Sequence, residues 1–342
     1  MECTPGERET LAAVVEEHVR TGEAAGSQAV SHRVAKPVSS ATIRNRMAAL
    51  ESKGLLSHPH TSAGRVPTDA GYRYYVDELL PASPPDPQVV RTVAASLQSQ
   101  QDLEPALQLT CRLLAELTKQ ASLASPPDWQ EERLQYVEVR DVSRHQVLLV
   151  VIGSSGRISH SVVTMSAAPD RVTLRVFSRR LNEHFHGAKL STITAEALMG
   201  VAQGLTAGPE FCRQAAEVLR SPGGASRSFL LDGASNMLAY QEFQDTPRLQ
   251  ALMALLEQDH PLADLLGRAT TERVTLLIGV ESAQPALEDC ALVCRAYRLA
   301  DGTTGTVAVL GPKRMRYDLA IANLNLVVDF LNRALWGAAA RA

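Results

Sequence analysis

Apolar residues recur at helical spacing in the first part of the chain. A capping box of Thr4 and Glu7 predicts the start of a first helix, and Gly22 predicts its end. The apolar stripe of this helix consists of Leu11, Val14, Val15 and Val19. Ser27 can cap a second, short helix, which Pro37 stops. The pattern therefore predicts two helices before a turn at residue 37.

A third helix is expected from residue 40 to residue 53, with Ser39 as its cap. On a helical wheel Ile43, Met47 and Leu50 fall on one side and must face the core. The other side carries small and polar residues, namely Ala41, Thr42, Asn45, Ala48 and Ala49, with Arg44 at its edge. A helix that enters the DNA major groove needs slim residues for close approach and donors that pair with base edges. We therefore expect this helix to read DNA.

Two short extended segments, 55–56 and 65–67, follow this helix and flank a tip that contains glycine and proline. Helix, helix, turn, helix and hairpin is the order of a winged helix-turn-helix. Residues 31–75 carry seven basic and two acidic side chains, a net charge of +5, whereas residues 1–30 carry two basic and six acidic ones, a net charge of −4. This partition favours binding to DNA phosphates. A solvated basic helix beside a surface hairpin is the plainer alternative, and the coincidence of spacing, hairpin and charge disfavours it.

The expected DNA contacts divide into base readout and phosphate binding. Asn45 and Arg44 are assigned to base edges, and Lys53 and Arg65 to phosphates. The full predicted set is Ser40, Thr42, Arg44, Asn45, Arg46, Lys53, His60, Thr61, Ser62 and Arg65. A homodimer on an inverted repeat of double-stranded DNA is expected, because one winged helix covers too little groove for tight specific binding. The region after residue 87, chiefly 178–266, is expected to form the dimer.

The remaining chain alternates between segments of helical and of β character. Four prolines in residues 81–87 predict a linker, and two helical patterns follow before residue 123. β character runs from 134 to 176 and returns from 274 to 310, and an amphipathic helix from 317 to 335 ends the chain. The predicted fold class is α+β multidomain, in which one α+β domain carries a mostly helical insertion. The expected boundaries are 1–80, 81–133 for the linker and connecting helices, 134–177 with 267–342, and 178–266 for the insertion.

Composition and cysteine usage favour a reducing compartment. At 342 residues, 45% of them hydrophobic, the chain can build several cores, and its net charge of −3 conceals the local basic segment. The first residues lack the apolar run of a signal peptide, and no apolar run approaches the roughly 20 residues of a membrane helix. Five cysteines without a CxxC pair fit free thiols, and Cys290 and Cys294 fit core packing. The chain is therefore expected to be cytoplasmic.

Enzyme signatures are absent from the sequence, which contains no GxSxG, GxxxxGK, GxGxxG, HExxH or CxxC. His184 and His186 stand in a helical setting that splays their rings apart, so we expect surface histidines. Catalytic residues, cofactors and metal ions are therefore not expected. The alternative function is a metabolite-sensing winged-helix regulator, although no polar cluster in residues 134–176 or 274–310 marks a ligand pocket.

Six segments carry a resemblance to a known family: 38–45 (VSSATIRN), 59–69 (PHTSAGRVPTD), 71–77, 236–238, 242–243 and 305–317 (GTVAVLGPKRMRY). They resemble the HrcA heat-shock repressors. The resemblance implies a winged-helix domain, a GAF-like domain and a dimerising domain inserted into it. It also implies an inverted-repeat CIRCE operator upstream of groE- and dnaK-type chaperone operons, negative regulation of heat-shock genes, and repressor activity supported by the GroE chaperonin.

Two residues depart from the pattern of that family. Arg46 stands where an acidic residue is common, and its place beside the reading helix predicts an effect on affinity or operator preference. Lys313 stands where threonine is common. Because Lys313 is expected to lie far from the DNA, we attach no functional consequence to it.

Overall fold

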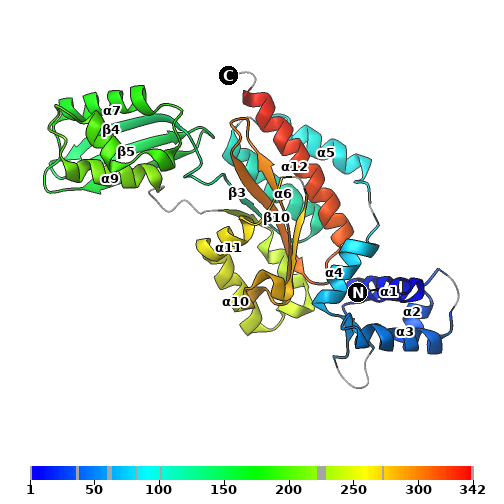
Figure 1. Ribbon diagram of the computed structural model, residues 1–342. Coiled ribbons are helices and arrows are strands. Elements are labelled where there is room, and N and C mark those ends of the chain that lie inside the picture. The colour runs from blue at the N-terminus through cyan, green and yellow to red at the C-terminus, as the bar shows by residue number, and fades with distance from the viewer. Residues whose placement is uncertain are drawn as a thin grey trace.

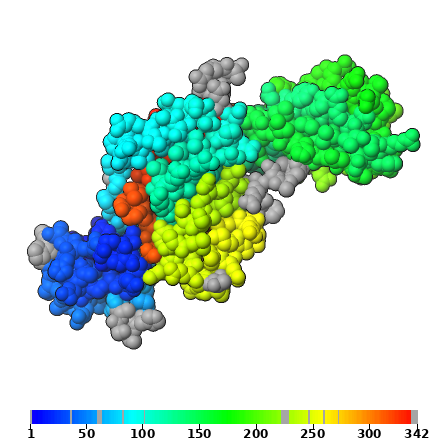
Figure 2. All heavy atoms as spheres, turned by 180° about the vertical axis from the view of Figure 1, so that it is seen from behind, coloured from blue at the N-terminus to red at the C-terminus, as the bar shows by residue number. Residues whose placement is uncertain are grey.

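The computed structural model describes residues 2–35, 38–59, 64–81, 83–100, 102–221, 229–271 and 273–339. Figure 1 shows three units: an N-terminal unit of residues 2–80, a central domain built around one sheet, and an outlying domain of residues 129–221. The central domain combines residues 83–125 with residues 229–339. The N-terminal unit and the outlying domain lie at opposite ends of the molecule (Figure 2).

The N-terminal unit contains the predicted helices followed by a short hairpin. Its elements are α1 (Pro5–Thr21), α2 (Ser27–Ser31), α3 (Ser40–Ser52), β1 (Leu56–Ser57), β2 (Val66–Pro67), α4 (Asp69–Tyr74) and the π-helix η1 (Tyr75–Leu79). The capping box is present, because the Thr4 side chain accepts from the Glu7 N–H while the Glu7 carboxylate accepts from the Thr4 N–H. Gly22 ends α1 with φ of 76°, and Ser39 caps α3 through the Thr42 N–H. The predicted starts of α1 and α3 are therefore confirmed. The expected cap of α2 is wrong, because Gly26 occupies the cap position and Ser27 is the first residue of the helix, where no side chain caps it.

The hairpin gains a third strand-like segment that the sequence pattern did not indicate. Ala25 and Arg65 exchange both backbone hydrogen bonds, with N···O distances of 2.8 Å and 3.0 Å. A Cβ atom on Gly64 would lie 2.2 Å from the Ala25 carbonyl oxygen, so glycine is needed for this close approach. The segment after α1 therefore anchors the base of the hairpin beside α3.

The central domain is a five-stranded antiparallel sheet with the order β7-β3-β10-β9-β8. Its strands are β3 (Ala121–Ser125), β7 (Leu230–Asp232), β8 (Thr275–Ile278), β9 (Cys290–Arg298) and β10 (Thr304–Pro312). Helices α5 (Pro87–Leu97), α6 (Leu103–Thr118) and α12 (Tyr317–Ala339) cover one face. The other face packs against η3 (Ala234–Ala239), η4 (Gln241–Phe243), α10 (Thr246–Glu257) and α11 (Asp259–Leu266). Cys290 and Cys294 are buried in this second core, as the sequence predicted.

The outlying domain has a smaller sheet, with the order β4-β5-β6, and helices on one face (Figure 1). Its elements are β4 (Leu134–Ser143), β5 (Gln146–Gly153), β6 (Ile158–Thr164), α7 (Arg171–Phe185), η2 (Leu190–Thr192), α8 (Ala195–Val201) and α9 (Pro209–Arg220). Phe177 of α7 and Phe211 of α9 meet edge to face at 5.0 Å over the inner face of the sheet.

The α+β fold class is confirmed, whereas the structure groups the strands differently from our expectation. We expected 134–177 to share a domain with 267–342. Instead, 134–164 form a separate sheet, the chain between β3 and β7 forms the insertion, and α10 and α11 cover the central sheet. Alternating apolar residues reveal a half-buried strand and leave its partner undetermined. The short strand β3 was also hidden at the end of a helical pattern.

Residues 171–176 form the start of α7 and not the strand we expected. The Asp170 side chain caps this helix by accepting from the Val172 and Thr173 N–H groups, each at 2.9 Å. The hydrogen bond from the Thr173 N–H, with those from the hydroxyl groups of Thr173 and Thr206 and from the Val172 N–H, lowers the pKa of Asp170 to about 2. Leu174 is buried, whereas Val172 is 71% exposed. Residues two positions apart in a strand would lie on the same face and be buried together. The alternation of Val172, Leu174 and Val176 therefore led to the wrong prediction of a strand.

Candidate nucleic-acid interface

Helix α3 turns its apolar side inward and its small, polar side to solvent, as predicted. Ile43, Met47 and Leu50 are buried in the core of the N-terminal unit. The exposed residues of the opposite side are Ala41, Thr42, Arg44, Asn45 and Ala48. Ser40 lies at the edge of this face, where its hydroxyl is 2.8 Å from the Ser27 hydroxyl of α2. The short side chains leave the helix slim enough to approach another molecule closely.

Arg44 and Asn45 are the free hydrogen-bonding groups of this face. Within the described ranges, neither side chain forms a hydrogen bond or an ion pair. An arginine can donate two parallel hydrogen bonds to guanine, and an asparagine can donate to and accept from adenine. The exposed face therefore presents two unengaged groups with the chemistry of base recognition.

Lys53 is placed differently from the phosphate-binding role predicted for it. Its ammonium lies 2.8 Å from the Glu7 carboxylate and donates to the Glu2 carbonyl oxygen at 3.0 Å. The hydrogen bond to Glu7 raises the pKa of Lys53, and the same contact lowers the pKa of Glu7. Lys53 therefore joins the end of α3 to the start of α1, and a phosphate would have to displace an acidic partner.

Arg65 is likewise held by an ion pair inside the N-terminal unit, whereas Arg46 only packs against it. The Arg46 guanidinium lies against α1, where a Cβ atom on Gly6 would be 2.6 Å from its Cζ atom. Arg65 donates to the Glu51 carboxylate at 2.9 Å and lies 2.8 Å from the His58 ring nitrogen. Arg65 thereby ties the hairpin to the last turn of α3. Arg65 is therefore an internal support, whereas the Nη1 atom of Arg46 is buried without a hydrogen-bond partner among the described residues.

The remaining predicted contacts, His60, Thr61 and Ser62, lie outside the described residues. The positive charge that the sequence assigned to this region is also less available than its sum of +5 suggests. Arg33 pairs with Glu17, and Arg73 points to the central domain, where it donates to the Leu276 carbonyl oxygen at 2.7 Å. Arg44 is therefore the described basic side chain of α3 that is fully presented to solvent.

Sequence reasoning missed the residues that fix α4 to helix α3. The Thr68 hydroxyl donates to the Gly54 carbonyl oxygen at 2.6 Å, and the Thr68 N–H donates to the Leu55 carbonyl oxygen at 3.1 Å. A Cβ atom on Gly71 would lie 2.1 Å from the same Leu55 oxygen. Threonine followed by aspartate at a helix start is a capping signal in the sequence, although it does not reveal these partners.

Other chemical sites find little support in the described part of the chain. It contains no group of three or more His, Cys, Asp or Glu side chains that could hold a metal ion. Burial raises the pKa of Cys111, Cys290 and Cys294 to about 12, so these thiols are not ionised nucleophiles at neutral pH. His184 and His186 are exposed, and each ring bonds to a different carbonyl oxygen. In the same described residues, no helix is both long and apolar enough to cross a bilayer.

A cavity of about 780 Å³ lies between the N-terminal unit and the central domain. Its acidic side chains are already paired: Asp69 with Lys313, Glu242 with Arg314, and Asp289 with Arg248. The hydroxyl of Tyr72, which also lines the cavity, is buried and has no partner among the described residues. The described residues that line this cavity therefore offer no unpaired charge that would bind a charged ligand.

Comparison with known proteins shows similarity along nearly the whole chain. The family model described as the HrcA protein C-terminal domain matches residues 104–321. The heat-inducible transcription repressor HrcA of Symbiobacterium thermophilum is 33% identical, covering 94% of this chain and 96% of the relative. The protein of the same name from Moorella thermoacetica is 34% identical, with 96% of each chain covered. Both names are those of repressors and not of enzymes, in agreement with the sequence prediction.

One solved structure shares the fold of the entire chain. It is a crystal structure at 2.2 Å resolution of a protein described as hypothetical, with a TM-score of 0.60, 24% sequence identity and 98% of each chain covered. The family match exceeds half of the chain, and the two relatives exceed 30% identity over almost all of it. This protein therefore belongs to the HrcA family.

Proposed function

We propose that this protein is a cytoplasmic heat-shock transcriptional repressor that binds double-stranded DNA through a winged helix in its N-terminal unit. The proposed target is a CIRCE-type inverted repeat upstream of groE- or dnaK-type chaperone operons. The observation that carries the proposal is the outer face of α3, where Arg44 and Asn45 are exposed and unengaged beside small neighbours. The names of the relatives supply the heat-inducible repressor class.

Within this proposal, Asn45 and Arg44 read base edges, and Ser40 and Thr42 lie beside the DNA backbone at the N-terminus of α3. The hydroxyl groups at this helix end suit phosphate contact, because backbone N–H groups and the helix dipole favour anions there. The ion pairs of Lys53 and Arg65 favour a supporting role for these two residues. His60, Thr61 and Ser62, which lie between β1 and β2 in the sequence, complete the proposed set.

We assign homodimer formation to the outlying domain, because one face of its sheet carries apolar side chains while its helices pack on the other face. Tyr136, Ile152 and Ile158 lie side by side across the three strands, and Leu148 pairs with Val162. Ile158 is 66% exposed and Val162 is 51% exposed. Apolar surface of this kind is typical of association sites, and a second copy would match the two-fold symmetry of an inverted repeat. The central domain is the GAF-like domain of this scheme.

Footprinting of the purified protein on DNA upstream of chaperone operons tests the proposed function. We expect protection of an inverted repeat, with two equivalent half-sites separated by about one or two helical turns. A scrambled half-site provides the matched control, since nonspecific phosphate binding would be unaffected by scrambling. Equal binding to the intact and scrambled sequences would contradict the proposal.

A metabolite-sensing regulator is the alternative, and the cavity between the N-terminal unit and the central domain is the place to test it. Because its charged groups are already paired, we expect no metabolite to raise the melting temperature of the protein. A thermal-shift screen measures this, since a ligand that binds the folded state stabilises it. A concentration-dependent rise would favour the alternative.

Chaperonin dependence forms the last part of the proposal and rests on the family resemblance. Apparent DNA affinity scales with the folded, binding-competent fraction, so a partner that restores that fraction controls repression. We expect GroE with nucleotide to increase the active fraction measured by operator titration, and unfolded competitor protein to abolish the increase. An active fraction that is complete without chaperonin and insensitive to competitor would place the switch elsewhere.

A further inference from the structure

Helix α4 presents two oppositely charged side chains, one turn apart, to the central domain. Asp69 accepts from the Lys313 ammonium at 2.8 Å and from the Val280 N–H at 3.1 Å. Arg73 donates to the Leu276 carbonyl oxygen and forms a two-point ion pair with Glu281. We refer to Asp69, Arg73, Glu281 and Lys313 as the clasp.

The central domain is shaped to receive the Asp69 and Arg73 side chains of α4. Gly279, in the turn after β8, has φ of +52°, and a Cβ atom there would lie 2.2 Å from an Asp69 carboxylate oxygen. The Glu281 carboxylate also accepts from the Ile278 N–H at 2.9 Å, which fixes it opposite Arg73. Close fit on both sides of the contact distinguishes the clasp from a chance meeting of surface charges.

Further contacts connect α4 to α12 of the central domain on one side and to the end of α3 on the other. The rings of Tyr72 and Tyr317 are 6.0 Å apart, and the Tyr317 hydroxyl donates to the Lys313 carbonyl oxygen at 2.6 Å. On the other side, Thr68 bonds α4 to the segment that ends α3. A movement of α4 relative to the central domain therefore moves the exposed face of α3 with it.

We propose that the clasp sets the orientation of α3 relative to the central domain, and thereby the separation of the two reading helices in the dimer. Asp69 and Lys313 are then positioning residues for operator recognition, although neither lies on the exposed face of α3. The proposal departs from our expectation that Lys313 has no functional consequence. The inference rests on the proposed function, because it presupposes a dimer that reads two half-sites.

The test uses the full chain with the substitutions Lys313→Met and Asp69→Asn. Lys313→Met removes the ammonium and keeps most of the aliphatic stem, and Asp69→Asn keeps an acceptor for the Val280 N–H while removing the charge. Lys189→Met is the matched control, because Lys189 forms a comparable ion pair with Glu131 in the outlying domain. Each protein is titrated with a single half-site and with inverted repeats whose spacing is changed one base pair at a time.

We expect both clasp variants to keep the half-site affinity of the wild type. Their affinity for the preferred spacing should fall about fivefold, as weakening of a partly exposed ion pair allows, and neighbouring spacings should become nearly equivalent. Lys189→Met should retain the wild-type spacing profile. An unchanged profile in the clasp variants, or an equal loss on half-site and full site, would overturn the proposal.

A second measurement needs no DNA and separates failure of the clasp from failure of the proposed function. Hydrogen exchange at the Ile278 and Val280 amides should be faster in Lys313→Met than in the wild type, and unchanged in Lys189→Met. Equal exchange in all three proteins would overturn the clasp, whatever the DNA result. If the wild type binds no inverted repeat, the proposed function is wrong and the positioning role falls with it.

Discussion

The N-terminal unit and the outlying domain lie at opposite ends of the central domain and leave opposite kinds of surface open (Figure 2). The outer face of α3 in the N-terminal unit is polar, with Thr42 and Asn45 exposed. The open sheet face of the outlying domain carries apolar side chains, with Ile158 and Val162 exposed, beside the polar residues Glu138, Arg140 and His160. Water solvates the first surface readily and the second unfavourably. The outer face of α3 therefore suits reversible binding of a polar partner. The open sheet face suits a permanent contact between two copies of the chain.

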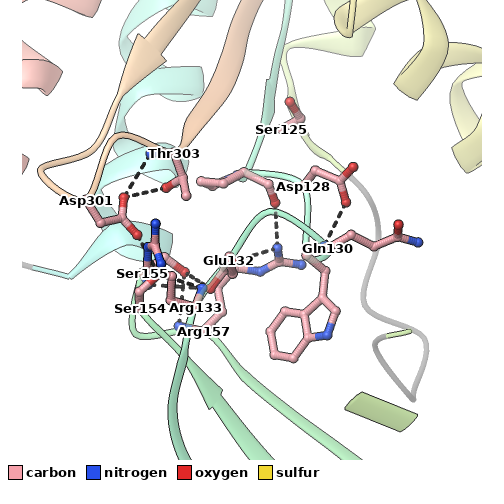
Figure 3. Close-up of polar contacts among 12 residues, drawn as sticks. Ser125, Asp128, Gln130, Glu132, Arg133, Ser154, Ser155, Arg157, Asp301 and Thr303 are labelled. Atoms are coloured by element: carbon pink, nitrogen blue, oxygen red, sulfur yellow. Dashed lines mark hydrogen bonds and ion pairs between the residues drawn. The ribbon is translucent and has the colours of Figure 1, made fainter. Parts of the chain in front are cut away.

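The two units are also attached to the central domain differently. The clasp holds the N-terminal unit to the surface of the central domain. The second joint is the place where the chain passes from the central domain into the outlying domain, around residues 127–133, and its polar contacts lie mostly inside the outlying domain (Figure 3). There the buried Glu132 carboxylate accepts from the Ser155 hydroxyl at 2.8 Å and pairs with Arg157 at 3.2 Å. Arg157 also donates to the Pro127 carbonyl oxygen and stacks over the Trp129 ring at 5.3 Å. This cluster ties the connector, residues 127–133, to the outlying domain. A hydrogen bond from Ser154 to Asp301 joins the outlying domain to the central domain.

Charge on the open sheet face should have the largest effect on operator binding. Ile158→Glu places a carboxylate on the proposed contact between copies, so we expect a monomer in solution. Loss of the second binding unit should weaken full-site binding by about a hundredfold or more. Analytical ultracentrifugation and operator titration measure the two effects. Val172→Glu, on an exposed position of α7, should change neither quantity, and a dimeric Ile158→Glu protein would refute the assigned face.

Removal of the arginine from the second joint should strongly destabilise the outlying domain. Arg157→Met leaves the buried Glu132 carboxylate without its cation, at an expected cost of about 3 kcal/mol in the free energy of unfolding. Urea denaturation followed by circular dichroism measures this. Arg179→Met removes the exposed partner of Glu183 on α7 and should cost less than about 0.5 kcal/mol. Similar losses in the two variants would mean that the connector is not held by this pair.

Removal of a base-reading group should have an intermediate effect on DNA affinity. Asn45→Ala is expected to cost about 1–3 kcal/mol of binding free energy and to relax sequence preference at one position of each half-site. Competition titrations with single-base operator variants provide the measurement. Ser52→Ala, in the last turn of the same helix, should leave affinity and preference as they are. An unaltered preference in Asn45→Ala would show that another face of the N-terminal unit reads the bases.

Lowering the pH should stabilise the second joint slightly. Burial raises the pKa of Glu132 above its ordinary value of 4.5, while Ser155 and Arg157 lower it in part. A carboxyl group with a higher pKa in the folded chain binds its proton more tightly there. Its contribution to stability is therefore fully present below pH 4.5 and lost as the pH rises through the raised pKa. Unfolding free energies between about pH 4 and pH 7 should show this slope in the wild type and a flatter one in Glu132→Gln. Parallel profiles would contradict it.

Local signals in the sequence were sufficient to locate the first three helices of the N-terminal unit. Thr4 and Ser39 mark helix starts through contacts within four residues, and helical spacing alone oriented α3. Strand partners were not predictable, because Leu123 pairs with Ala308, far along the chain. The same limit applies to charges. Arg73 and Lys53 both add to the basic count of the sequence, and only the tertiary fold reveals that each is paired with an acidic side chain.

Substitution of Lys53 should have the smallest effect on binding, and it separates the charge count from the geometry. A lysine on a phosphate contributes about 0.9 to the slope of log affinity against log salt concentration. Because the Lys53 ammonium is held by Glu7 and the Glu2 carbonyl oxygen, we expect Lys53→Met to leave that slope unchanged. Any loss of affinity should be small and independent of salt, since it arises from looser packing of α3 on α1. Anisotropy titrations at several salt concentrations measure the slope. A decrease of about 0.9 would mean that DNA draws the ammonium away from Glu7, and the sequence-based assignment to a phosphate would then hold in the complex.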